Sequence, residues 1–549
     1  MSNSATLISR RDLLRKAAAL VGMAPIAGGI LNACAQPAAV PTAPVSPTGA
    51  AKPAATTAPA AAQPSPLPKK DLVFVEGTDL TVLDPMMVTD TPTYGACLMV
   101  YDGLVTWDKD MKIVPVLATK WEISEDKKTW TFHLRPNVKF SNGVPFTSKS
   151  VQFTLERLLD QATGSPHRAL FTVLERVETP DDLTAKIVTS VPFPDLLVNL
   201  AGTSFLMYEP DHTKKFSVKE YGRNPVGTGP FMLKEWISGD RVVFVPNPYY
   251  WGPPPKVSSI IYKPVPEGAA RAAMLRTGEA DIVVKIPPEE IKNLESDPNV
   301  NVLKLDSMYQ VSYELNVTKE DPPLNKKLVR QALNHAVDKE AIVKNILMGL
   351  GAPMVSPFGP GIQYRATFEP YKYDPERAKK LLADAGYPNG FKLTLWTPSG
   401  RYLKDKEVSE AVQSYLRAVG VQAEVKVWEW SPYVTAIRQD PAREAMLLGR
   451  ATPGADYTAT RLFSKGAIGQ YNVTGFWHEK IEELLPKARA SFDDKERTEL
   501  YREIQRIVWD EAPWIFLHNQ KAVVGTRKNI EGFVMLPHEV TILADVVKK

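Results

Sequence analysis

The histidines and cysteines are the side chains of this sequence best suited to catalysis or metal binding, and their spacing argues against a local active site. The closest pair of histidines, His518 and His538, is 20 residues apart, which is not a zinc-binding spacing. The 2 cysteines cannot form a four-thiolate metal site or a disulfide scaffold. The sequence also has no Gly-x-Ser-x-Gly elbow, His-Glu-x-x-His motif or phosphate-binding loop. We therefore expect a protein that is not an enzyme, with neither a metal nor a cofactor.

Two sequence patterns near the N-terminus resemble signals for protein export and lipidation. Arg10 and Arg11 precede an apolar stretch of about 15 residues, and this order resembles a twin-arginine export signal. Cys34 ends the sequence Leu-Asn-Ala-Cys, which resembles the lipobox whose cysteine becomes the lipidated first residue of a bacterial lipoprotein. We expect residues 1–33 to be an export signal and Cys34 to carry a lipid anchor.

The segment after Cys34 has the composition of a linker. In residues 35–68, Ala and Pro occupy 21 of the 34 positions, and no aromatic or acidic residue occurs. Such a chain buries too little apolar surface to offset the entropy lost when it becomes ordered. We therefore expect residues 34–70 to tether a folded body to the membrane.

The body that follows is long and nearly neutral. Of the formal net charge of +4, residues 1–33 contribute +3. The remaining charge of +1 gives the body no electrostatic reason to bind nucleic acid, and we expect none as a partner. With 549 residues, of which 44% are hydrophobic, the chain is long enough for more than one core.

Strand and helix patterns alternate along the body. Apolar or alternating stretches predict strands at 72–75, 130–135, 242–245, 392–396 and 423–428. Asp374 followed by Pro375 predicts the start of a helix that runs to residue 385. Asp493 and Glu496 form a capping box at the start of a second helix, which ends at Pro513. The sequence therefore predicts a mixed α/β fold.

Short blocks distributed over residues 71–549 resemble one bacterial family. The most specific is PVLATKWEISEDKKTWTFHLRPNVKFSNGVPF at residues 115–146. The others lie at residues 83–85, 101–104, 224–231, 247–252, 278–281, 329–338, 373–378, 400–406 and 513–515. Together they resemble the bacterial extracellular solute-binding proteins of family 5, the peptide- and nickel-binding components of ABC importers.

The resemblance implies a type II periplasmic-binding-protein-like fold of two α/β lobes, with a ligand cleft and a hinge between them. Lobe I would comprise residues 71–305 and 515–549, with an extra inserted subdomain near 114–224. Lobe II would comprise residues 306–514. The chain would cross between the lobes twice, which allows hinge closure on a ligand.

The resemblance also indicates ligand-binding residues. Trp430 matches a position where a family tryptophan faces the cleft, and its ring offers an apolar platform with one polar edge. Arg401 and Tyr402 match a family loop that contacts ligand, and the Arg401 guanidinium can bind a carboxylate through two parallel hydrogen bonds. Asp456 and Tyr457 match a turn that lines the cleft. The alternatives are core packing for Trp430, a solvated loop position for Arg401 and a helix-capping role for Asp456.

The ligand class stays open. Peptide-binding relatives carry an aspartate for the peptide's amino group just before the turn at Asp456, whereas residues 449–454 contain no acid. A buried ammonium group without a carboxylate is costly, so we expect binding to depend little on a free α-amino group. Peptides, sugars, opines, glutathione and metal chelates all occur as ligands within the family.

The function implied by the resemblance is solute capture for import. The protein would be a monomeric lipoprotein outside the cytoplasm, anchored to the membrane by its lipid. It would bind a peptide or another small polar solute and deliver it to the permease subunits of an ABC importer. Two other functions fit the sequence: an extracytoplasmic hydrolase or amidase, and a ligand-sensing partner of a membrane receptor.

Overall fold

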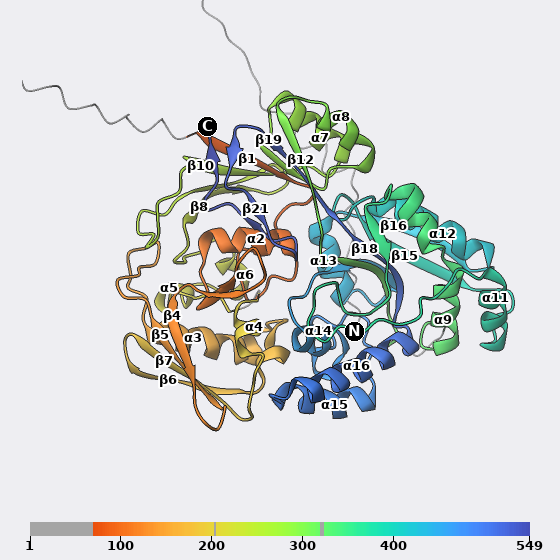
Figure 1. The fold of residues 1–549 in the computed structure, drawn as a ribbon, viewed down its shortest axis with the longest axis horizontal. Coiled ribbons are helices and arrows are strands. Elements are labelled where there is room, and N and C mark those ends of the chain that lie inside the picture. The colour runs from red at the N-terminus through yellow and green to blue at the C-terminus, as the bar shows by residue number, and fades with distance from the viewer. Residues whose placement is uncertain (1–69, 203–204, 319–322) are drawn as a thin grey trace, which may run out of the picture. The chain divides into compact units, whose positions relative to one another are not determined.

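The computed structural model describes residues 70–202, 205–318 and 323–549. The predicted export signal, Cys34 and all but the last residue of the predicted linker lie outside the described residues. Two large β-sheets and one smaller sheet organise the described part of the chain (Figure 1).

The first large sheet has seven strands in the order β12-β19-β11-β1-β10-β9-β8. Its central strand, β1 (Asp71–Glu76), is parallel to both of its neighbours, β10 (Ser259–Pro264) and β11 (Ile282–Val284). The other strands are β8 (Phe231–Ile237), β9 (Arg241–Pro246), β12 (Val300–Leu305) and β19 (Ala522–Arg527). Helices α7 (Gly268–Thr277) and α8 (Ile291–Glu295) lie beside β12 and β19 (Figure 1). Because β19 pairs with both β11 and β12, segments from both ends of the body build this sheet.

The second large sheet has six strands in the order β14-β18-β13-β17-β15-β16. They are β13 (Gln310–Leu315), β14 (Gly351–Pro353), β15 (Lys392–Pro398), β16 (Gln422–Trp428), β17 (Ala445–Arg450) and β18 (Trp514–Gln520). The helices that accompany it are α9 (Lys327–Ala336), the short α10 (Lys339–Ala341), α11 (Pro375–Asp384), α12 (Asp405–Ala418), α13 (Trp430–Gln439), α14 (Ala455–Phe463), α15 (Glu479–Ala490) and α16 (Asp494–Glu511). All six residues of β13 are buried, because it pairs on one side with β17 and on the other with β18.

A four-stranded antiparallel sheet lies within the segment predicted to be an inserted subdomain. Its strands are β4 (Ala118–Ile123), β5 (Thr129–Leu134), β6 (Leu174–Asp181) and β7 (Thr184–Thr189), in the order β4-β5-β7-β6. Helix α3 (Ser148–Leu159) packs on β6 and β7. Shorter elements in this part of the chain are β2 (Val105–Trp107), β3 (Ile113–Pro115), α4 (Leu196–Leu200), α5 (Pro210–Thr213) and α6 (Val218–Tyr221). Helix α2 (Thr91–Val100) packs on β8 of the first large sheet.

The chain passes between the two large sheets twice. The first passage follows β12, which ends at Leu305, the residue at which the sequence placed the first lobe boundary. The second passage lies between β18 and β19, at Lys521. Residues 515–520, which the sequence assigned to lobe I, therefore pair with β13 in the second sheet. We propose Lys521 as the second boundary in place of residue 514.

The predicted helices start at the expected aspartate caps. Asp374 caps α11 by accepting a hydrogen bond from the backbone N–H of Arg377 at 2.9 Å. Asp493 caps α16 through the N–H groups of Lys495 and Glu496, at 2.8 and 3.0 Å. The capping box predicted for Asp493 and Glu496 forms only in part, because the Asp493 N–H donates to the Ser491 hydroxyl, which in turn donates to Glu496. The predicted strands are confirmed as β1, β5, β9, β15 and β16. Local sequence signals therefore determine these elements.

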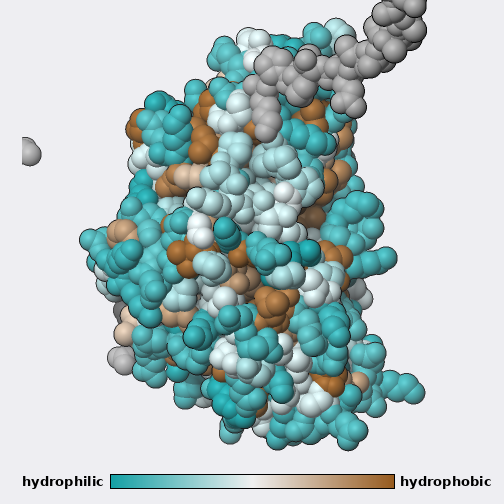
Figure 2. Space-filling view, turned by 90° about the vertical axis from the view of Figure 1, so that its left-hand side faces the viewer, coloured by the Kyte–Doolittle hydropathy of each residue, from teal (hydrophilic) through white to brown (hydrophobic). Residues whose placement is uncertain are grey.

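One face of the molecule, drawn in Figure 2, is largely hydrophilic. On this face, hydrophobic residues form small separate groups among hydrophilic ones. Among the described helices, none has the length and hydropathy needed to cross a membrane.

Candidate ligand-binding site

A cavity lies among segments that follow strands of both large sheets. Its enclosed free space is about 50 Å³, and about 750 Å³ when the open space at its mouth is included. Aromatic rings form much of its wall: Tyr94, Trp107, Tyr309, Tyr402, Trp430, Tyr457 and Tyr471. Asp90 and four arginines supply the charged groups.

Four of the five predicted ligand-binding residues, Arg401, Tyr402, Trp430 and Tyr457, line this cavity. Trp430 also belongs to the hydrophobic core around the second sheet, so it packs in the core and faces the cavity at once. The fifth, Asp456, is not among the described residues that line the cavity, and its role as a ligand contact stays a prediction.

Asp456 is a buried connector between helices. Its carboxylate lies 2.9 Å from Nε of Arg489, accepts a hydrogen bond from Asn199 at 3.1 Å and accepts another from Thr460 at 3.0 Å. These partners come from α15, α4 and α14, respectively. The carboxylate therefore stabilises the packing of these helices.

Arg401 is held in place by the loop that follows β15. The Asp405 carboxylate accepts hydrogen bonds from the backbone N–H groups of Arg401 and Tyr402, at 2.8 and 3.1 Å. The Arg401 guanidinium donates to the Tyr309 hydroxyl and lies 5.1 Å from the centre of the Trp430 ring. Although Arg401 is only 1% exposed, its Nε has no partner among the described residues.

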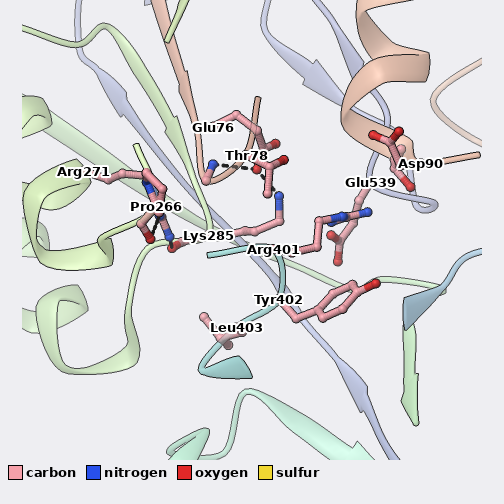
Figure 3. A network of polar contacts seen from close by, with 12 residues as sticks. Glu76, Thr78, Asp90, Pro266, Arg271, Lys285, Arg401, Tyr402, Leu403 and Glu539 are labelled. Atoms are coloured by element: carbon pink, nitrogen blue, oxygen red, sulfur yellow. Dashed lines mark hydrogen bonds and ion pairs between the residues drawn. The ribbon is translucent and has the colours of Figure 1, made fainter. Parts of the chain in front are cut away.

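The surroundings of Arg401 keep it charged. Burial alone would lower its pKa, but Tyr309, Tyr402 and Glu76 raise the pKa well above its usual range. In Figure 3 the guanidinium points towards Asp90 and Glu539, and the Tyr402 ring extends in the same direction, with its centre 4.9 Å from the guanidinium carbon. A permanently charged, buried guanidinium with a free donor suits an anionic ligand group.

A buried ion pair lies next to Arg401 (Figure 3). Lys285 donates to the Glu76 carboxylate, and both side chains are buried. Burial would raise the pKa of Glu76, but the positive charges of Lys285 and Arg401 lower it, so the carboxylate stays ionised. Arg271 closes the network by donating to the carbonyl groups of Pro266 and Lys285 at 2.8 and 2.9 Å.

Three further arginines line the cavity and were missed by the sequence reasoning. Arg450 forms a bidentate ion pair with Glu314, with Nε–Oε1 and Nη2–Oε2 distances of 2.6 and 2.8 Å. Arg438 donates to the carbonyl groups of Gln470 and Val434, at 2.9 and 2.5 Å. Arg461 donates to the Tyr457 hydroxyl. For Arg461, the sequence did contain a usable signal: its i, i+4 spacing from Tyr457 places both residues on the same face of one helix.

The cavity carries excess positive charge. Arg401, Arg438 and Arg461 have no carboxylate within ion-pair distance in the part of the chain that the structure describes, whereas Glu314 neutralises Arg450. Asp90 holds the single carboxylate among the described lining residues, so two positive charges are in excess. Asp90 also caps α2, accepting from the Thr93 N–H at 3.0 Å.

Comparison with known proteins places the chain in a family. The sequence model of the bacterial extracellular solute-binding proteins, family 5 (middle region), matches residues 112–469. The chain belongs to this family. Its members are binding proteins, and the predicted family and type II fold are confirmed. Within the described ranges, no cluster of three or more His, Cys, Asp or Glu residues could hold a metal ion.

Relatives with stated ligands extend over most of the chain. The glutathione-binding protein GsiB of Shigella flexneri is 33% identical over 477 residues, which cover 85% of this chain and 92% of the relative. The ABC transporter-associated periplasmic binding protein DppA of Helicobacter pylori, solved with the peptide STSA, is 30% identical with a TM-score of 0.81, covering 87% of this chain and 98% of that one. A dipeptide-binding protein from Pseudoalteromonas, solved with Met-Leu, is 25% identical with a TM-score of 0.82, covering 87% and 100%.

Proposed function

We propose that this protein captures a small anionic organic solute, such as an acidic peptide or peptide-like acid, and delivers it to an ABC importer. The observation that carries the proposal is the cavity in which three arginines without carboxylate partners face a single aspartate. Charged groups this deeply buried are stabilised by partners of opposite charge, and a bound anion supplies them. The aromatic wall would cover the apolar part of such a ligand.

The relatives support a ligand of this size and class. GsiB is named for glutathione, a tripeptide with two carboxylates, and DppA was solved with a short peptide. In this chain Asp90 is the described lining residue that a ligand's ammonium group would meet. Both Asp90 oxygens already accept hydrogen bonds, from Thr93 and Thr81. We therefore retain the proposal that affinity depends only weakly on a free α-amino group.

The proposal includes a place of action outside the cytoplasm. Arg10 and Arg11 would direct export, and the lipid on Cys34 would anchor the protein to the membrane, with residues 34–70 as the tether. The protein would act as a monomer that carries its ligand to permease subunits. The alternatives of a hydrolase and of a receptor partner gain no support from the cavity, where arginines and aromatic rings predominate.

The test is a thermal-shift and calorimetry screen of the purified protein. The panel contains acidic, neutral and basic dipeptides, glutathione, N-acetylated peptides, opines, oligosaccharides and nickel–histidine. A ligand at a hundredfold excess over its Kd stabilises the folded state by about 2.7 kcal/mol. We expect this stabilisation from acidic compounds, with or without a free amino group. Tight binding confined to basic or uncharged compounds would contradict the proposal.

A further inference from the structure

The Arg461 side chain lies in an aromatic box of its own. Its guanidinium carbon is 3.4 Å from the centre of the Tyr471 ring and 4.5 Å from that of Tyr457. Its Nη1 donates to the Tyr457 hydroxyl, and the residue is only 1% exposed. The Tyr457 and Tyr471 rings, together with helix α14, hold the Arg461 guanidinium at the wall of the cavity.

Two hydrogen-bond donors of the Arg461 guanidinium have no acceptor among the described residues. Nε and Nη2 of Arg461 are buried and have no hydrogen-bond partner among the described residues. Buried donors in native proteins are almost always paired, because an unpaired charged donor loses its hydration without compensation. Nε and Nη2 are adjacent on one edge of the guanidinium, and their N–H bonds point the same way. This edge forms the fork that holds one carboxylate through two hydrogen bonds.

The same chain contains an internal example of this geometry. Arg450 uses Nε and Nη2 to hold both oxygens of Glu314. The equivalent edge of Arg461 has no protein carboxylate opposite it in the described part of the chain. Both arginines line the same cavity. The difference is that Glu314 satisfies Arg450, whereas the fork of Arg461 is available to a ligand.

The electrostatic surroundings of Arg461 favour an added anion. Burial and the positive charges of Arg450 and Arg461 lower the pKa of Arg438 to about 10. Burial would raise the pKa of Tyr471, but the same group of arginines lowers it. Glu314 is already engaged by Arg450, and Asp90 is the one carboxylate among the described lining residues, so positive charge remains in excess. A carboxylate at Arg461 would relieve the mutual repulsion of these arginines.

The Arg461 box is separate from the site of Arg401. The rings around Arg401 are Tyr309, Tyr402 and Trp430, and none of them is a ring partner of Arg461. Arg401 comes from the loop after β15, whereas Arg461 comes from α14. The two guanidinium groups therefore line the cavity from different elements, each with its own ring partners.

We propose that Arg461 is a second anion-binding residue, which holds the distal carboxylate through Nε and Nη2, so that the ligand is a solute with two acidic groups. This inference rests on the proposed function, since Arg401 would bind the first of those groups. The inference narrows the ligand class from anionic solutes to diacids.

The experiment uses calorimetry on the full chain in detergent with matched probe pairs. Each pair differs in one carboxylate: glutathione and its glycine amide, Ala-Glu and Ala-Gln, glutarate and its monoamide. We expect wild-type protein to bind at least one diacid about 10- to 100-fold more tightly than its amide, as charge-assisted hydrogen bonds require. Arg461→Gln should abolish that preference and leave affinity for the amide nearly unchanged. Arg461→Lys, which keeps the charge and loses the fork, should retain part of it.

A control variant and three contrary results separate this inference from the proposed function. Arg506→Gln, on the exposed face of α16, should leave the preference intact. Equal binding of diacids and their amides by wild-type protein would overturn the inference and leave the proposed function standing. If Arg461→Gln weakens the binding of diacid and amide equally and also lowers the melting temperature, Arg461 has a structural role and the inference is overturned. Failure of every acidic probe to bind would contradict the proposed function itself.

Discussion

Gly77 and Gly400 bring the backbones of the two large sheets into direct contact. Gly77 follows β1 of the first sheet, and Gly400 follows β15 of the second. A Cβ atom on Gly77 would overlap the carbonyl oxygen of Gly400. A Cβ atom on Gly400 would lie 2.9 Å from the carbonyl oxygen of Gly77 and 2.6 Å from that of Pro266. Because Gly400 precedes Arg401, this contact brings the cavity arginine up to the first sheet.

Replacing Gly77 by Ala should therefore prevent this approach without changing a residue that lines the cavity. Overpacking of this kind costs about 1–3 kcal/mol, which corresponds to a roughly 5- to 150-fold weaker affinity if closure accompanies binding. Calorimetry with the best ligand of the screen measures the effect. Gly466→Ala is the matched control, since a Cβ atom there would have no neighbour within 4 Å. Unchanged affinity in Gly77→Ala would show that the contact is not needed for binding.

Trp430→Ala should weaken ligand binding about 5- to 150-fold, because it removes an aromatic surface worth about 1–3 kcal/mol. It should also lower the free energy of unfolding by about 3–5 kcal/mol, since Trp430 is only 5% exposed. Trp428→Ala is the control, because Trp428 packs against Trp396 with tilted rings and does not line the cavity. We expect both variants to melt earlier in thermal denaturation. Equal affinity losses in both would mean that Trp430 acts through folding alone.

Anchoring can be tested in the membrane fraction. We expect wild-type protein to partition into detergent and Cys34→Ala to become soluble or to remain unprocessed, because the Cys34 thiol is the proposed site of lipid attachment. Replacing Arg10 and Arg11 by Lys should block export if the twin-arginine route is used. Equal partitioning of wild-type and Cys34→Ala protein would exclude the lipid anchor. Undiminished secretion of the Lys variant would indicate the general secretory route.

Stability should fall in acid because of His518. Burial lowers the pKa of this histidine to about 3, and neither ring nitrogen has a partner among the described residues. In the unfolded chain the pKa is about 6.5, so only the unfolded state takes up the proton as the pH falls from about 6.5 towards 3. The free energy of unfolding should therefore decrease there by up to about 1.4 kcal/mol per pH unit.

The measurement is urea denaturation of wild-type protein and His518→Leu between pH 7.5 and pH 4.5. The variant removes the titrating group, so its stability should decline less steeply with acid than that of the wild type. Parallel pH profiles would show that His518 does not control the acid sensitivity.

The sequence determined the elements whose causes are local. Alternating apolar residues predicted β5 and β16, and the aspartate caps at Asp374 and Asp493 predicted the starts of α11 and α16. These signals act within a few residues of the chain, so they can be recognised without the fold. The family blocks likewise indicated Arg401 and Trp430, both of which line the cavity.

Only the tertiary structure decided how distant residues combine. The family blocks indicated Asp456 as a ligand contact, and the fold pairs its carboxylate with Arg489 and with Asn199, which is 257 residues away in sequence. Arg450 and Arg461 differ in role solely because β13 brings Glu314 to one of them. No local pattern encodes such pairings, because they depend on the path of the whole chain and on which charges burial leaves without a partner.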